Sequence, residues 1–164
     1  MVNFYRFLKK FLKTKSLSGQ SNNDQINQAG FNLKDKLYNL ETIKKHFDKL
    51  NLYSYFDIEI IQDDNELQLD EIEYGIVSGF AIWSGPAYAL SNHILNLIKH
   101  SNKPKIRLII IDTDYISIEL QKKIFETVMH GYFESCLIIN GEINKRYKRA
   151  PDIEPFINAV NKSR

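Results

Sequence analysis

An apolar strand that leads straight into a helix is the feature that most constrains the fold of this chain. Residues Ile76–Trp83 are apolar or small at nearly every position, including Gly79 and Ala81. This pattern is typical of a central strand that is covered on both faces. After the strand, Ser84 is a preferred helix-capping residue, and the apolar spacing predicts a helix over Ala87–His100. A doubly covered strand followed by a helix predicts an α/β protein.

The same kind of periodicity predicts the other elements. Leucine, isoleucine and phenylalanine recur at spacings of three and four over residues 33–50, which predicts a longer amphipathic helix. Asn140-Gly141 is a strong hairpin signal, because both residues tolerate positive φ. Leu67–Ile72 is compatible with either a strand or a loop. The remaining predicted elements are strands at Phe56–Ile61, Ile106–Asp112 and Ser135–Ile139, and helices at Ile118–Met129 and from Ala150 onward. Together they predict a central mixed β-sheet with helices on both faces.

The segment Trp83-Ser84-Gly85-Pro86-Ala87 resembles the Trp-Cys-Gly-Pro-Cys motif of thioredoxins, with both cysteines replaced. The apolar strand before it, the helix after it and the Asn140-Gly141 hairpin, which continues as Glu142, have compatible spacing. This resemblance extends from Tyr74 to Val160, about half of the chain. It implies a thioredoxin-like fold.

The resemblance also implies that the redox parts of the family are replaced. Ser84 and Ala87 stand at the two cysteines, and Ser78 stands at the buried aspartate that accepts a proton. Gly131 falls on the glycine before the family's cis-proline loop, and Phe133 falls on the proline itself. A cis bond before a residue other than proline costs roughly 2.5–4 kcal/mol, so a trans peptide is expected at Phe133. The resemblance therefore implies a redox-inactive member that has kept the scaffold.

Other residues that could carry chemistry have simpler structural interpretations. Cys136 is the only cysteine and lies within an apolar strand, where a thiol behaves as a small buried hydrophobe. Ser84 is better explained as a helix cap than as a nucleophile, because no histidine is placed near it. Asp112 and Asp114 follow a buried strand, where α/β proteins often place functional carboxylates. Capping of the strand end is the favoured interpretation of both. The four histidines are not at metal-ligand spacing, so no metal site is expected. No cofactor and no enzymatic activity are expected either.

Composition and length predict one domain with an N-terminal extension. The chain has 164 residues, of which 43% are hydrophobic, and this is enough for one sizeable core. Residues 31–164 are expected to form the thioredoxin-like domain. A single cysteine requires no oxidising compartment, and no apolar run reaches about 18 residues. A cytoplasmic location is therefore expected.

Residues 1–30 are predicted to form a basic amphipathic helix and a flexible polar linker. Phe4, Phe7 and Phe11 fall on one helical face, with cations opposite. Such a helix could lie on an anionic membrane surface, bind a partner, dock on its own domain or stay partly disordered. The linker is predicted over Lys15–Gly30, which is rich in serine, asparagine, glutamine and glycine.

The strongest functional signal is an acidic run without a counter-ion. Between Asp57 and Glu73 there are eight acidic residues and no basic one. Such a run is either a solvated loop and edge strand or a docking surface for a basic partner. The residues predicted to bind a partner are Asp63, Asp64, Glu66, Asp70, Glu71 and Glu73.

These observations predict a non-catalytic thioredoxin-like module that binds another protein and does not bind nucleic acid. The more specific hypothesis is an immunity protein that neutralises a cognate bacterial toxin, such as a nuclease with a basic cleft. One alternative is an enzyme of the thioredoxin superfamily that uses a single cysteine or none. Another is a membrane-peripheral adaptor that is anchored by the N-terminal helix. Insulin reduction tests the first alternative, and liposome flotation tests the second.

Overall fold

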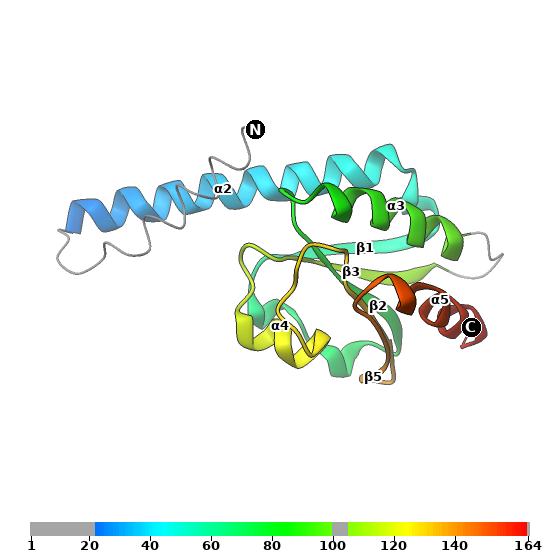
Figure 1. Ribbon diagram of the computed structural model, residues 1–164. Helices are drawn as coiled ribbons and strands as arrows, with labels where there is room; N and C mark the ends of the chain where they lie inside the picture. The colour runs from blue at the N-terminus through cyan, green and yellow to red at the C-terminus, as the bar shows by residue number, and fades with distance from the viewer. Residues whose placement is uncertain (1–21, 100–104, 164) are drawn as a thin grey trace. The chain divides into compact units, whose positions relative to one another are not determined.

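The computed structural model describes residues 22–99 and 105–163 (Figure 1). The chain divides into two units between Tyr38 and Asn39. The described part of the first unit is the beginning of helix α2 (Asn22–Lys49). The second unit contains the end of α2 and every other element. None of the helices in these described ranges is long and apolar enough to cross a membrane.

The second unit alternates strands and helices after α2. Its strands are β1 (Phe56–Ile61), β2 (Tyr74–Phe80), β3 (Ile106–Asp112), β4 (Ser135–Ile139) and β5 (Glu142–Tyr147). Its further α-helices are α3 (Gly85–Lys99), α4 (Ile118–Phe125) and α5 (Ile153–Lys162). Single turns of 3-10 helix are η1 (Leu52–Ser54), η2 (Asp64–Glu66), η3 (Leu69–Glu71) and η4 (Ala150–Asp152).

The strands form one mixed sheet in the order β1-β3-β2-β4-β5. β3 lies parallel to both β1 and β2, whereas β4 is antiparallel to β2 and to β5. The central strands are apolar because both of their faces are covered. Ile76 of β2, for example, lies between Leu108 of β3 and Leu137 of β4, and all three are at most 1% exposed.

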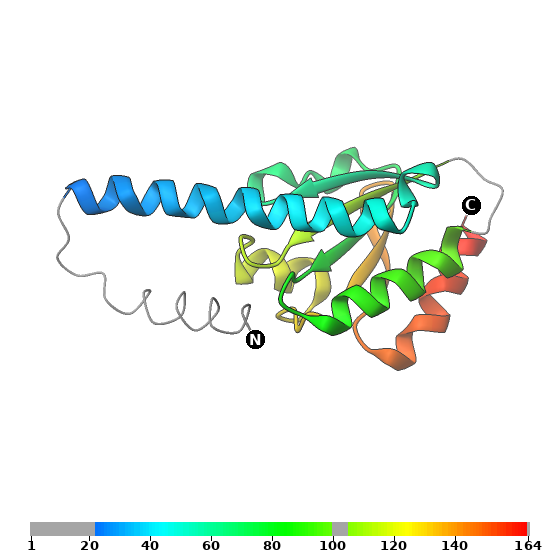
Figure 2. The ribbon, with the colours of Figure 1, turned by 90° about the horizontal axis from the view of Figure 1, so that it is seen from above.

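A separate hydrophobic core lies on each face of the sheet (Figures 1 and 2). On one face, α3, α5 and the last turns of α2 surround Phe80 of β2, with Phe47 and Phe156 fully buried. On the other face, α4 and the segment that contains η2 and η3 cover Val77 and Ile111. The predicted mixed sheet with helices on both faces is therefore confirmed.

The structure corrects the predicted N-terminal linker. Residues 22–30 of the predicted Lys15–Gly30 linker are helical, because α2 begins at Asn22. Local propensity does not account for this start of α2, because residues 22–30 contain three asparagines, one aspartate and one glycine, which favour a helix less than the two glutamines and the alanine among them. The predicted amphipathic helix with Phe4, Phe7 and Phe11 lies outside the described residues.

Several other predicted assignments also change. β2 ends at Phe80 instead of Trp83, because the chain turns before α3. α4 ends at Phe125 instead of Met129, since Glu126 adopts a left-handed conformation with φ 58°. Leu67–Ile72 is neither a strand nor an irregular loop throughout. It contains the 3-10 turn η3, and the side chains of Leu67 and Leu69 pack against the α4-side core.

Candidate functional site

The junction of β2 and α3 holds the segment that resembles the thioredoxin motif. The chain turns after β2, and the Ser84 N–H donates to the Ala81 carbonyl at 3.0 Å. The Ser84 hydroxyl accepts a hydrogen bond from the Ala87 N–H at 3.4 Å, which confirms its predicted role as a helix cap. The same hydroxyl donates to the Gly131 carbonyl at 2.5 Å. Ser84 is 5% exposed, so its hydroxyl is a buried structural group whose proton is already donated.

The loop before β4 packs against this junction at very short range. Gly131 has φ +79°, and a Cβ added there would lie 2.8 Å from both Oγ and Cβ of Ser84. Phe133 also has positive φ, at 57°, and its buried ring lies edge-on to Phe80 at 6.4 Å between centroids. The described residues contain no cis peptide, so the trans bond expected at Phe133 is confirmed. A residue other than glycine in the left-handed region of backbone conformation, such as Phe133, costs the folded state about 1–3 kcal/mol.

Glu134 stabilises the backbone of this loop through its side chain. Its side chain is completely buried, and its carboxylate accepts the N–H groups of His130 at 2.7 Å and Tyr132 at 3.0 Å. These two bonds fix the backbone on either side of Gly131. The loop is therefore shaped by Glu134, which the sequence analysis did not single out.

Ser78, which the resemblance aligns with the family's buried acid, belongs to a chain of hydroxyl hydrogen bonds. Its Oγ lies 2.7 Å from Ser135 Oγ. Ser135 in turn donates to the Phe133 carbonyl at 2.8 Å. Because each hydroxyl has one proton, Ser78 donates to Ser135. The interior beside this loop thus contains two uncharged hydroxyls, those of Ser78 and Ser135, and both donate a hydrogen bond.

Cys136 lies in the middle of β4 with 0% of its surface exposed. Burial raises the pKa of its thiol to about 12. A thiolate is the reactive form, and it needs an accessible and electropositive environment. The interpretation of Cys136 as a buried hydrophobe is confirmed.

Asp112 and Asp114 organise the edge of the sheet where the parallel strands end. The Asp112 carboxylate accepts hydrogen bonds from Gln62 Nε2 at 2.8 Å, from Asn39 Nδ2 at 3.3 Å and from the Asp114 N–H at 3.2 Å. Burial raises the pKa of Asp112 to about 6, although these hydrogen bonds oppose the shift. Asp114 accepts from Asn39 at 3.1 Å and from Trp83 Nε1 at 3.0 Å. The predicted strand-end capping is confirmed in a more extended form.

Trp83 presents a fixed aromatic surface next to this network. It is 41% exposed, and its ring nitrogen is held by Asp114. Tyr132, 46% exposed, lies in the loop that packs against Ser84. In residues 22–99 and 105–163, no group of three or more histidine, cysteine, aspartate or glutamate side chains could hold a metal ion.

The six acidic residues predicted to bind a partner divide into two sets. In the first set, the carboxylates stabilise local backbone. Asp63 accepts the Asn65 N–H at 3.0 Å, Asp64 accepts the Ser117 N–H at 2.8 Å, and Glu66 accepts the Gln62 N–H at 2.8 Å. Asp64 therefore connects η2 to the beginning of α4.

The second set consists of Asp70, Glu71 and Glu73, which are all exposed. None of the three carboxylates forms an ion pair with another described residue. Their backbone lies against the β4–β5 turn, because the Asn140 N–H donates to the Glu73 carbonyl at 2.7 Å. This second set is the part of the acidic run that is presented to solvent.

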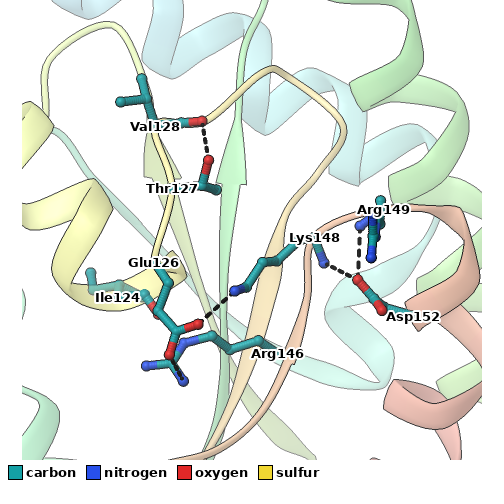
Figure 3. Close-up of polar contacts among 8 residues, drawn as sticks. All are labelled: Ile124, Glu126, Thr127, Val128, Arg146, Lys148, Arg149 and Asp152. Carbon is teal, nitrogen blue, oxygen red and sulfur yellow. Dashed lines mark hydrogen bonds and ion pairs between the residues drawn. The ribbon is translucent and has the colours of Figure 1, made fainter.

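Two basic residues near the end of the chain, Arg146 and Lys148, share one acidic partner, Glu126 (Figure 3). Arg146 and Lys148 of β5 and its continuation contact the two carboxylate oxygens of Glu126, at 2.8 Å and 2.6 Å. Arg146 Nε also donates to the Ile124 carbonyl at 2.8 Å. Asp152 accepts the N–H groups of Lys148 and Arg149, both at 3.2 Å. These contacts join β5 to the end of α4 and to the start of α5.

Comparisons with known proteins identify the architecture. No protein-family model matches the chain, and no curated protein matches it either. Among solved structures, oxidised mitochondrial thioredoxin 3 of Saccharomyces cerevisiae matches 64% of this chain and 94% of its own, with a TM-score of 0.50 and 17% identity. The thioredoxin of Malassezia sympodialis (Mala s 13) matches 65% of this chain and 90% of its own, with a TM-score of 0.50 and 12% identity. The chain has a thioredoxin-like fold. At these identities the likeness shows the fold alone.

Within this thioredoxin-like fold, the Ser84 hydroxyl at the β2–α3 junction forms hydrogen bonds with Gly131 and Ala87. Ser84 caps the helix, Ala87 has no reactive group, and Cys136 is buried in a strand. The residues that sequence reasoning missed are Asn39 and Gln62, which hold the Asp112 carboxylate. They had no local signal, because each lies at least 50 residues from its partner.

Proposed function

We propose that this thioredoxin-like protein is redox-inactive and works by binding another protein. The observation that carries the proposal is the state of the β2–α3 junction. Thiol–disulfide exchange begins with attack by a thiolate on a disulfide sulfur. At the junction, Ser84 is buried and hydrogen-bonded to Gly131, and Ala87 offers no second sulfur. The sole thiol, Cys136, is enclosed in β4 with its pKa raised by burial.

The binding surface in this proposal is the acidic run, and its solvent-facing part is Asp70, Glu71 and Glu73. Exposed carboxylates without a cation partner attract a basic surface and accelerate association with it. Asp63, Asp64 and Glu66 support the same surface by holding η2 in place. A basic protein domain is therefore the partner that this surface fits, and nucleic acid is not.

The specific form of the proposal is a cytoplasmic immunity protein that neutralises a cognate bacterial toxin. An inhibitor of this kind needs a rigid scaffold and a charged docking surface, and it needs no chemistry of its own. Two features support this form. Exposed carboxylates lie in η3 and beside it, and the thiol of the chain's one cysteine, Cys136, is buried. A basic nuclease cleft is the toxin surface that would complement them.

Insulin reduction in the presence of dithiothreitol tests the redox part of the proposal. The protein should not accelerate precipitation of the insulin B chain above the rate of the reagent alone, because no thiolate is available. Cys136→Ser is the matched variant. Acceleration by the wild type that disappears in Cys136→Ser would show a single-cysteine enzyme. Acceleration that persists in Cys136→Ser would show catalysis without cysteine, and either result would overturn the proposal.

A further inference from the structure

The two edges of the sheet are protected very differently. β5 forms one edge, and its pairing with β4 contains a bulge between Leu137 and Ile138. It also carries Lys145 and Arg146, and bulges and basic residues are devices that discourage pairing with another chain. β1 forms the other edge (Figure 1), and its register with β3 is regular from Phe56 to Ile61. β1 contains neither lysine nor proline.

Alternate residues of β1 turn their backbone groups away from the sheet. The Ile106 N–H donates to the Tyr55 carbonyl at 3.4 Å, which fixes the pairing at the beginning of the strand. In a parallel pair, the N–H and C=O of one residue point to the same side, and those of the next residue point to the other. The backbone groups of Phe56, Ile58 and Ile60 therefore face the open edge. No described strand pairs with β1 on that side.

The side chains beside this edge are acidic on one face of the sheet. Phe56 belongs to the core on the α3 side, so Asp57 and Glu59 lie on the α4 side, where Ile61 is buried. Both acidic side chains are exposed. One cation contacts them, since Arg107 binds Glu59 at 3.0 Å with its side chain 36% exposed.

The acidic edge is continuous with the proposed binding surface. Arg107 Nη1 also donates to the Glu71 carbonyl at 3.4 Å, so η3 lies on the same face of the sheet as Glu59. The acids of this region therefore outnumber the one cation that contacts them. A segment that paired with β1 would place alternate side chains directly beside Asp57 and Glu59, with Cβ separations of about 4.5–5.5 Å.

We infer that β1 binds an extended segment of the partner as an added strand, and that this segment carries lysine or arginine at alternating positions. The inference rests on the proposed function and specifies the chemistry of the partner. The open backbone groups of Ile58 and Ile60 supply the main-chain hydrogen bonds, and Asp57 and Glu59 select the side chains. A second copy of this chain is a poor occupant, because antiparallel pairing of β1 with itself would place acidic residues near one another.

A synthetic peptide of ten residues with alternating lysine and threonine is the probe. It is titrated into the isotope-labelled full chain at low salt, and amide hydrogen exchange is measured by NMR. Exchange at the amides of Ile58 and Ile60 should slow at least about tenfold at saturation, because added-strand hydrogen bonds protect them. The amides of the opposite edge strand, β5, should not change.

A second peptide separates backbone pairing from simple charge attraction. It has the same sequence, with N-methyl groups on the amides that would pair with β1, so it keeps every charge and loses those donors. It should bind much more weakly. Ile58→Pro should likewise weaken binding of the first peptide, whereas Ile58→Ala, which loses at least as much side-chain packing but keeps the N–H, should bind it normally. Proline at this position removes no bond to β3, because the Ile58 N–H faces outward.

The outcomes separate this inference from the proposed function. Peptide binding without protection of Ile58 and Ile60 would overturn the added strand, and so would equal binding of the N-methylated peptide or no binding at all. None of these results touches the redox-inactive proposal, which depends on insulin reduction. They also leave the docking role of Asp70 and Glu73 to its own test by charge reversal.

Discussion

At the scale of single residues, Asp112 makes the stability of the protein depend on pH. Its folded-state pKa is raised from 3.8 to about 6 by burial. The folded state therefore holds the proton more tightly than the unfolded state. The stability that this proton contributes is fully present below about pH 4 and is lost as pH rises through about 6.

Asp112→Asn removes this titration, so the free energy of unfolding of the wild type should fall relative to the variant between pH 4 and pH 7. A shift of this size corresponds to roughly 1–3 kcal/mol. Urea unfolding of both proteins at four pH values in this range is the measurement. If the free energies of unfolding of the two proteins change with pH in the same way, Asp112 is not the group that causes the pH dependence. The comparison uses the change with pH and not the absolute stability, because asparagine also disturbs the hydrogen bonds from Gln62 and Asn39.

Two glycines next to the β2–α3 junction give a matched pair of substitutions. Gly131→Ala should destabilise the protein by roughly 1–3 kcal/mol, because Gly131 has φ +79° and its new Cβ would meet Ser84 at 2.8 Å. Gly85→Ala should be neutral or stabilising by up to about 1 kcal/mol, because a Cβ there meets nothing within 4 Å at the start of α3. Chemical denaturation of the two variants measures the difference. Equal losses would show that the contact between Gly131 and Ser84 is not tight.

At the scale of elements, the last turns of α2 belong to the core of the second unit. Ile43 and Phe47 are 0% exposed, and His46 contacts Phe80 and Tyr88, with ring centroids at 5.2 Å and 4.8 Å. Phe47→Ala should therefore destabilise the protein by about 3–5 kcal/mol, because it empties a large buried volume.

A chain shortened to residues 31–164 keeps these contacts, so its melting temperature should stay within a few degrees. A large drop on shortening would show that residues 1–30 contribute to the core.

The elements also show what local sequence can and cannot predict. β2 and β3 were predictable because an uninterrupted apolar run is a local signal of a doubly covered strand. The start of α2 was not, since a polar segment rich in glutamine and asparagine fits a linker and a solvated helix equally well. Leu67–Ile72 was ambiguous because its apolar spacing suits a strand as well as two turns that pack on a sheet. The Asn39–Asp112 contact depends on tertiary structure, because 73 residues separate its two members.

At the scale of the whole molecule, the acidic surface distinguishes a structural carboxylate from one that can dock a partner. Asp64 accepts the Ser117 N–H at 2.8 Å, so its replacement would disturb the start of α4. Asp70 and Glu73 are exposed and hold no described cation, so their replacement should hardly change stability. The charge-reversing variant that tests docking is therefore Asp70→Lys with Glu73→Lys.

The candidate partner is the protein that the neighbouring gene encodes. If that protein is basic and binds here, the double reversal should chiefly lower the association rate. Long-range attraction accelerates encounter and is screened by salt, with a Debye length of about 8 Å at physiological ionic strength. Association of the wild type should slow as salt rises, and the variant should be slow at all salt concentrations. Lys145→Glu with Lys162→Glu, a double reversal of opposite sign at exposed residues of β5 and α5, is the control and should not slow association. Kinetics at two salt concentrations separate these cases. If the association rate changes neither with salt nor with the Asp70 and Glu73 reversals, the partner must bind elsewhere on the fold. A dissociation rate that rises as well would place one of these two carboxylates at the buried centre of the interface, where its loss leaves a cation of the partner unpaired.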